Sequence, residues 1–230
     1  MGGRKIASTP CVPQPSYTVA DYVQEGLIAM WDGIENVGVG THDSDSVVWK
    51  DLVGDKDMLL YRNSAFLSSC LSIDDVSYAC SQDPITSIGT IEVCLSRTDG
   101  NNDVCLLSLD SAGGRQMRNF ISWYGNKIGF SETDSRTYVA MSCPKNWDVT
   151  TFTFVPVSGA VYSNGILKQN VSETFYYTTA VNYGGVSLNP GGIDRQRICG
   201  NWYCIRVYDR VLSDDEIAFN TAIDYERFVK

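Results

Sequence analysis

Apolar and polar residues alternate in short stretches along most of this chain, the pattern of strands that bury one face. Residues 90–96 are the clearest case, because Ile91, Val93 and Leu95 would all point to the buried side. Similar stretches predict strands at residues 26–33, 58–61, 104–107, 120–124, 127–130, 137–141, 147–157, 159–163, 166–168, 184–188 and 202–208. Many short strands separated by turn residues predict an all-β sandwich of two antiparallel sheets.

Three turns are expected to join neighbouring strands as hairpins, because glycine and asparagine accept the backbone angles of tight turns. They are Asp99-Gly100, Gly125-Asn126 and Asn164-Gly165. If the first is a two-residue turn, Cys94 and Cys105 lie opposite each other in the hairpin. We expect this pair to be close in space but reduced.

The strand over 202–208 is expected to be half buried, with alternate residues on opposite faces. Alternation places Tyr203, Ile205 and Val207 on one face, and Trp202, Cys204, Arg206 and Tyr208 on the other. We expect a single core between the sheets to contain Leu27, Ala29, Ile91, Ile205 and Val207.

A helix is predicted to begin at Ser213. Its hydroxyl and the side chain of Glu216 can form a capping box, while Leu212 and Ile217 can form a hydrophobic staple. Beyond the first turn, Phe219, Ala222 and Ile223 form a narrow apolar stripe, and Asp224 and Glu226 are expected elsewhere on the surface.

Four sequence stretches resemble laminin-G-like domains, which have a concanavalin A-like jelly-roll fold. They are "GLIAMWDG" at 26–33, "WKDL" at 49–52, "YSNG" at 162–165 and "GNWYCIRVYDRVLSDDEI" at 200–217. The last matches the C-terminal signature of that family at Gly200, Arg206, Val207, Tyr208, Arg210, Leu212, Ser213, Glu216 and Ile217. It departs at Asp209, usually Asn, and at Val211, usually Ala.

The resemblance covers both ends of the chain and implies a two-sheet antiparallel jelly roll with a short C-terminal helix. Domains of this type are common in phage and gut-bacterial surface proteins. The match is specific for the fold and says little about function, because one fold carries many different sites.

Two parts are expected: an extended arm over residues 1–25 and one laminin-G-like domain over residues 26–230. The arm contains three prolines and too few apolar residues to fold alone. It also carries a basic pair, Arg4 and Lys5, in an otherwise acidic chain. We therefore expect it to dock on other chains, either in a homo-oligomer or among virion structural proteins.

The net charge of −9 over 230 residues argues against binding nucleic acid. No apolar run approaches the roughly 18 residues of a membrane span, so no membrane insertion is expected. Residues 1–10 lack the apolar middle of a secretory signal. Two interpretations remain: the protein stays in the cell that makes it, or it leaves without that signal, as a phage structural protein does at lysis. Because of the family resemblance, we expect the virion surface, with a bacterial cell surface or the extracellular space as alternatives. The eight cysteines are expected to be free thiols.

Catalytic patterns are weak, and we expect no enzymatic activity. Glu132-Thr133-Asp134 lacks the closing glutamate of a glucanase motif, and His42 is the only histidine. Asp99, Asn101 and Asp103 have the alternate spacing of a calcium loop. The position that needs glycine is Val104, so a hairpin turn is the favoured interpretation and calcium the alternative.

Glycan binding would use exposed aromatic side chains beside polar ones. Tyr176, Tyr177 and Tyr183 lie among Thr, Asn and Gly and are the candidates. The function expected from the sequence is a non-enzymatic structural or decoration protein on a phage capsid, head fibre or tail, attached through its arm and adhering to host or mucosal glycans. A carbohydrate-binding lectin module of a bacterial surface protein is the first alternative, and a glycoside hydrolase is a more distant one.

Overall fold

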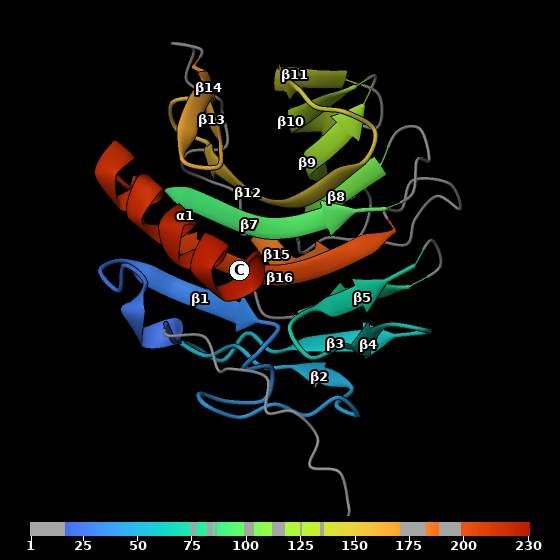
Figure 1. Cartoon of the computed structure of the whole chain (residues 1–230). Coiled ribbons are helices and arrows are strands. Elements are labelled where there is room, and N and C mark those ends of the chain that lie inside the picture. Colours follow the sequence, from blue (N-terminus) through green and yellow to red (C-terminus); the bar gives the residue numbers. More distant parts are fainter. Residues whose placement is uncertain are drawn as a thin grey trace, which may run out of the picture.

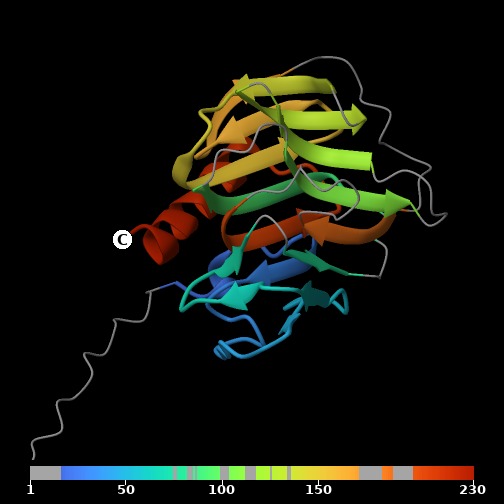
Figure 2. The same cartoon turned by 90° about the vertical axis from the view of Figure 1, so that its right-hand side faces the viewer.

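The computed structural model describes residues 17–74, 77–81, 85, 87–98, 104–111, 118–124, 126–133, 136–170, 183–188 and 199–230. Two antiparallel sheets pack face to face, and one C-terminal helix lies across the outer face of one of them (Figures 1 and 2). The predicted all-β jelly-roll sandwich with a C-terminal helix is confirmed.

The first sheet has eight strands in the order β14-β13-β12-β7-β16-β5-β4, with β1 also paired to β16. Its strands are β1 (Leu27–Asp32), β4 (Ala65–Phe66), β5 (Leu71–Ile73), β7 (Thr90–Arg97), β12 (Trp147–Val155), β13 (Ala160–Ser163), β14 (Ile166–Gln169) and β16 (Gly200–Tyr208). Strands from both ends of the chain therefore pair directly, as expected for a closed domain.

The second sheet also has eight strands, in the order β11-β10-β9-β8-β15-β6-β3-β2. They are β2 (Val48–Trp49), β3 (Met58–Tyr61), β6 (Tyr78–Cys80), β8 (Val104–Ser111), β9 (Arg118–Tyr124), β10 (Lys127–Thr133), β11 (Arg136–Ser142) and β15 (Tyr183–Leu188). The predicted hairpin around Asn126 is confirmed, because Lys127 of β10 pairs with Tyr124 of β9.

The interior core lies between the two sheets and contains the predicted inward residues Ile91, Val93 and Leu95 of β7. Ala29, Ile205 and Val207 join them, as expected. All eight residues of β7 are buried, although the strand alternates apolar and polar residues. Both faces of β7 are therefore covered, the inner one by the second sheet and the outer one by the helix.

Two β-bulges move residues away from the faces that simple alternation predicts. One lies between Leu27 and Ala29 in β1, and the other lies between Trp202 and Cys204 in β16. An extra residue reverses the side to which the following side chains point. Leu27 consequently packs on the helix side, whereas Trp202 enters the interior core in place of Tyr203. The predictions for these three residues were wrong.

The predicted hairpin between residues 90–96 and 104–107 was also wrong. β7 belongs to the first sheet and pairs with β12 and β16, whereas β8 belongs to the second sheet. Cys94 lies opposite Cys204, and Cys105 lies opposite Ser122. Turn residues indicate where a chain reverses, but they do not determine whether the next strand pairs with the last or crosses to the other sheet.

The helix α1 (Asp214–Phe228) begins as predicted, with Ser213 as its N-cap. The Ser213 hydroxyl accepts from the Glu216 amide at 3.3 Å, and the Ser213 amide donates to Glu216 Oε2 at 2.8 Å. Arg210 adds two further bonds to the same carboxylate, at 2.9 Å and 2.6 Å. These bonds from Arg210 and the helix cap lower the pKa of Glu216 to about 2.

Replacing Glu216 with glutamine is expected to lower the free energy of unfolding by about 1 kcal/mol at pH 7. A carboxyl group whose pKa is lower in the folded state stabilises the fold at pH values above its pKa in the unfolded state. This stabilisation is lost as the pH falls towards the pKa in the folded state. The difference from the parent should therefore shrink between pH 4.5 and pH 2. Denaturant unfolding at both ends of this range measures it, with Asp215→Asn as a control in the same helical turn. A difference that does not change with pH would contradict the explanation.

Residues 17–25, which fall in the predicted arm, pack against the domain. A short 3₁₀ helix, η1 (Val19–Asp21), is capped by Thr18, and the side chains of Val19 and Tyr22 are buried. The remainder of the arm, with Arg4 and Lys5, lies outside the described residues. Docking of that part on other chains stays a prediction. Within the described part of the chain, no helix is long and apolar enough to cross a membrane.

Candidate functional site

The face that α1 turns towards the first sheet is largely polar. Its buried residues are Ile217, Asn220, Ile223, Asp224 and Arg227, and Phe219 is 52% exposed. The predicted stripe was therefore wrong for Phe219 and Ala222, which are both exposed, and Asp224 is buried rather than on the surface. The physical reason is that the strands beneath the helix present Glu92 and Arg206, so the helix packs with complementary polar side chains.

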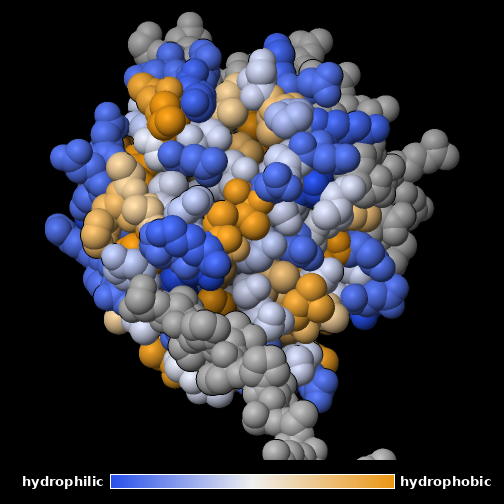
Figure 3. Space-filling view, viewed as in Figure 1, coloured by the Kyte–Doolittle hydropathy of each residue, from blue (hydrophilic) through white to orange (hydrophobic). Residues whose placement is uncertain are grey.

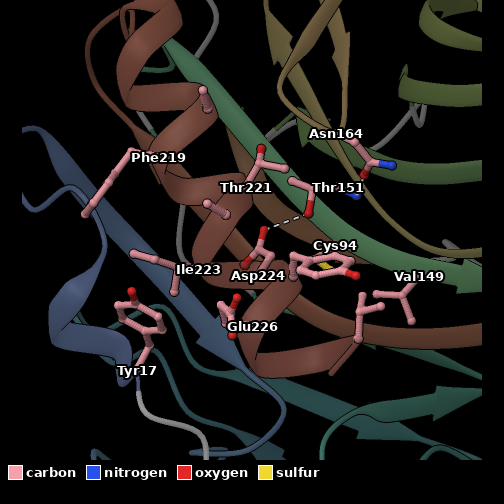
Figure 4. A pocket seen from close by; sticks show the side chains of 14 residues that line it. Tyr17, Cys94, Val149, Thr151, Asn164, Phe219, Thr221, Ile223, Asp224 and Glu226 are labelled. Atoms are coloured by element: carbon pink, nitrogen blue, oxygen red, sulfur yellow. Dashed lines mark hydrogen bonds between the residues drawn. The ribbon is translucent and has the colours of Figure 1, made fainter.

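Arg206 of β16 is the centre of this buried polar network. Its guanidinium donates two bonds of 2.7 Å to the carboxylate of Asp224 on the helix. A third bond of 2.8 Å joins its Nε to Glu92 of β7. Thr151 also donates to Asp224, at 2.7 Å, and the dashed line in Figure 4 marks this bond. Helix, β7, β12 and β16 are thus connected through one charged group.

The N-terminal segment joins the same network. Tyr22 donates from its hydroxyl to Asp224 at 2.7 Å, and the Val23 amide donates to Asn220 at 3.0 Å. At the end of the helix, Arg227 donates to Asp32 at 2.8 Å and to Glu35 at 3.1 Å. The segment that contains Tyr22 and Val23 and the C-terminal helix are therefore both held on the outer face of the first sheet.

Burial and charge oppose each other within this network. Burial raises the pKa of Glu92, and the neighbouring Arg206 counteracts that rise. Burial disfavours the charged form of Arg206, yet the carboxylates of Asp224 and Glu92 hold its pKa well above the usual value. Burial also raises the pKa of the Cys94 thiol well above its usual value. A protonated, buried thiol is a poor nucleophile.

A groove with a volume of about 570 Å³ follows α1 on this side of the molecule (Figure 4). Its lining residues come from the helix, from β7 and β12, from the β13–β14 turn and from the segment before η1. They are Tyr17, Cys94, Val149, Thr151, Asn164, Ala218, Phe219, Thr221, Ala222, Ile223, Asp224, Tyr225, Glu226 and Val229. A volume of this size accommodates a small ligand.

Exposed apolar and aromatic side chains concentrate along this groove. Phe219 is 52% exposed, Tyr225 51%, Val229 47% and Tyr17 38%. On the corresponding face, Figure 3 shows hydrophobic patches separated by hydrophilic residues. Figure 4 shows Thr221 and Asn164 near the groove as well, so hydrogen-bonding groups lie beside the apolar ones.

The predicted Asn164-Gly165 hairpin is confirmed, and it forms one border of the groove. Asn164 and Gly165 have positive φ angles of 49° and 73°. The Asn164 side chain accepts from the Thr151 amide at 3.0 Å, which fixes the turn against β12. A Cβ added to Gly165 would lie 3.2 Å from the Cα of Ala218, so the turn closely approaches the helix.

Replacing Gly165 with alanine is expected to lower the free energy of unfolding by about 2 kcal/mol, from backbone strain plus contact with the helix. Gly40→Ala is the matched control, because Gly40 has a φ of 71° but no atom within 4 Å of the added Cβ. It should cost only about 1 kcal/mol. Thermal or denaturant unfolding measures both, and equal losses would show that the helix contact adds nothing.

A second pair of aromatic residues lies on the outer face of the second sheet. Tyr61 of β3 and Tyr78 of β6 are cross-strand neighbours with stacked rings, 4.5 Å apart between centroids and inclined by 7°. Both are partly exposed. The helix groove combines exposed aromatic side chains with a hollow of about 570 Å³, so it is the stronger candidate site.

None of the site residues predicted from sequence has a described side chain. Tyr183 begins β15, opposite Ser111 in β8, and its side chain is not described. The other predicted residues lie outside the described part of the chain: Arg4, Lys5, Asp99, Asn101, Asp103, Tyr176 and Tyr177. The groove does include Phe219, Ala222 and Ile223 of the predicted apolar stripe, and Tyr225 on the same helix is the aromatic residue that the sequence pattern did not single out.

Among the described residues, no group of three or more His, Cys, Asp or Glu side chains could hold a metal ion. His42 contacts the Ile34 carbonyl through Nδ1 at 3.0 Å. Asp43 accepts from the Asp45 amide at 2.9 Å, as in a simple loop turn. Asp134 of the weak glucanase pattern lies outside the described residues.

The sequence matches no protein-family model and no curated protein. Solved structures show the same fold at low identity. Trypanosoma rangeli sialidase, in complex with 2,3-difluorosialic acid, has a TM-score of 0.66 and 13% identity over 89% of this chain. The match covers 34% of the sialidase, so this chain spans about a third of that protein.

Two smaller proteins also match. Domain 4 of AbnA, a GH43 extracellular arabinanase from Geobacillus stearothermophilus, in complex with arabinotriose, has a TM-score of 0.56 and 16% identity. The match covers 85% of this chain and 98% of that domain. The CBM40 of Ruminococcus gnavus IT-sialidase has a TM-score of 0.43 and 24% identity, over 59% of this chain and 83% of that one. The sialidase and the AbnA domain, at these identities, show a shared fold and nothing about function.

Proposed function

We propose that this chain is a non-enzymatic carbohydrate-binding module of the laminin-G-like, concanavalin A-type class, and that it holds a short glycan in the groove along α1. The observation that carries the proposal is the composition of the groove, in which exposed aromatic rings and hydrogen-bonding side chains line one hollow of about 570 Å³.

Sugars need both kinds of group. The C–H face of a sugar ring packs on an aromatic ring, and its hydroxyls exchange water for protein donors and acceptors. Tyr225 and Phe219 supply exposed rings on the helix. Thr221 and Asn164 line the same groove and supply a hydroxyl and an amide. Because Asn164 is held by its bond to the Thr151 amide, its amide group is positioned before a ligand arrives.

The shared fold supports the proposal at the level of class. Domain 4 of AbnA is nearly the same size as the matched part of this chain, and it was solved with arabinotriose. A sandwich of this kind can thus serve as a separate sugar-binding unit. The four sequence stretches that resemble laminin-G-like domains support the same class.

The groove carboxylates favour binding over hydrolysis. A retaining or inverting glycosidase needs one carboxyl as a proton donor and a second one free to act on the sugar or on water. Asp224 is 2% exposed and accepts bonds from Arg206, Thr151 and Tyr22. Glu226 is paired with Lys230. Neither carboxylate has the free, shielded environment of a catalytic acid.

Binding to a glycan array tests the proposal. The purified chain is expected to retain at least one class of plant, bacterial or host oligosaccharide and to leave it chemically unchanged. Calorimetry then gives the affinity for the best ligand. Absence of binding across all classes would contradict the proposed function, and release of reducing ends would show an enzyme instead.

We further propose that the module works on a virion surface, with a bacterial cell surface as the alternative location. This rests on the laminin-G-like sequence stretches, which resemble those of phage and gut-bacterial surface proteins. Residues 17–25 are anchored on the domain, so residues 2–16 are the part available for attachment to a homo-oligomer or to virion proteins. Deleting residues 2–16 should leave glycan binding intact and abolish incorporation, measured as copy number in purified particles. Normal incorporation would refute this location.

A further inference from the structure

The charged side chains that line the groove are both acidic. They are Asp224 and Glu226, and no lysine or arginine appears among the described lining residues. The whole chain is also acidic, with a net charge of −9. A ligand entering this groove therefore meets carboxylate oxygens and neutral groups, with no cation in the lining.

The nearest buried cation cannot be recruited by a ligand. Arg206 lies behind Asp224 and is 1% exposed. Its Nη1 and Nη2 donate to Asp224, each at 2.7 Å, and its Nε donates to Glu92 at 2.8 Å. Moving Arg206 towards a bound anion would leave two buried carboxylates without their counter-charge, which is strongly unfavourable.

Lys230, an exposed cation beside the lining residues Glu226 and Tyr225, is already paired. Lys230, at the end of the chain, forms an ion pair with Glu226 one helical turn before it. Its ammonium also lies 5.6 Å from the centre of the Tyr225 ring. If Lys230 turned to an anionic ligand, Glu226 would be left unpaired beside that ligand, and like charges would then face each other.

We propose that the groove selects uncharged oligosaccharides and discriminates against sugars that carry a carboxylate, such as sialic and uronic acids. Proteins recognise carboxylates through arginine or lysine donors, which this lining lacks in the described residues. This inference rests on the proposed carbohydrate-binding function and specifies its ligand class.

Matched pairs of ligands test the inference. Arabinotriose is compared with a trimer of galacturonic acid, and lactose with sialyllactose, by calorimetry at 0.15 M salt. In each pair for which binding is detected, the neutral ligand is expected to bind at least tenfold more tightly than the acidic one. Equal or tighter binding of the acidic member would overturn the inference and leave the proposed function standing. If neither member of either pair binds and the array is also negative, the proposed function itself fails.

A charge variant tests whether the preference for neutral ligands comes from the groove or from the overall charge of the chain. Glu226→Gln removes one lining carboxylate and is expected to narrow the ratio of neutral to acidic affinity at least threefold. Asp215→Asn changes the net charge equally at a helix position that does not line the groove, and it should leave the ratio within a factor of 1.5, roughly the error of such a comparison. The same narrowing in both variants would overturn the assignment to the groove.

Discussion

Replacing Arg206 with alanine is expected to lower the free energy of unfolding by about 3–5 kcal/mol, the usual cost of removing one partner from a buried charge network. The variant would leave Glu92 and Asp224 buried without their counter-charge, at 0% and 2% exposure. It would also remove the guanidinium that lies 4.1 Å from the Tyr22 ring. Denaturant unfolding followed by tryptophan fluorescence measures the loss.

Arg210→Ala is the matched control, because Arg210 also makes a two-bonded pair with a carboxylate, that of Glu216. The side chains of that pair are 27% and 29% exposed, so its loss should cost only about 1 kcal/mol. If Arg206→Ala does not fold, Arg206→Lys keeps a charge without the planar fork and should still cost about 1–2 kcal/mol. If the Arg206 variants lose no more unfolding free energy than Arg210→Ala, the buried network does not stabilise the packing of the helix.

Replacing Tyr225 with alanine is expected to weaken binding of the best glycan ten- to thirtyfold, or about 1.5–2 kcal/mol, as for an aromatic anchor in an interface. Tyr225 is half exposed and lines the groove, so its loss should affect binding more than stability. Adding Asn164→Ala should raise the total loss to about a hundredfold, because the two residues contact different parts of a ligand. Calorimetry with the ligand found on the array measures both.

Tyr61→Ala is the control for that prediction, since it removes a partly exposed tyrosine from the outer face of the second sheet. Its affinity should stay within twofold of the parent. The opposite result, with loss in Tyr61→Ala and none in Tyr225→Ala, would place the glycan on the second sheet and refute the helix groove as the site.

Local patterns in the sequence were sufficient for the parts of this fold that depend on neighbouring residues. The capping box of Ser213 and Glu216 needs only residues three positions apart, and it formed as predicted. The Asn164-Gly165 turn needs two residues that accept positive φ, and it also formed. The inward residues of β7 follow from alternation alone. In each case the interacting groups lie within a few residues of each other.

Register and pairing depended on distant parts of the chain. Leu27, Trp202 and Tyr203 were misplaced because a bulge shifts alternation by one residue. One bulge lies in the pairing of β1 with β16, and the other lies in the pairing of β16 with β7. The Asp99-Gly100 turn pattern could not show that β7 pairs with β12 and β16 instead of β8. Strand partners are chosen by which buried surfaces fit together in space.

The sequence by itself therefore determined the class of fold, most strand positions, the start of the helix and the negative net charge. Only the tertiary structure decided which face of the helix is buried, because Asn220, Asp224 and Arg227 look like surface residues until Glu92, Arg206 and Asp32 lie beneath them. The same packing leaves Phe219 and Tyr225 outside and so creates the groove. A buried charge is tolerated only beside its partner. These partners are separated by 18, 128 and 195 residues in the sequence. The site could therefore be recognised only in the folded chain.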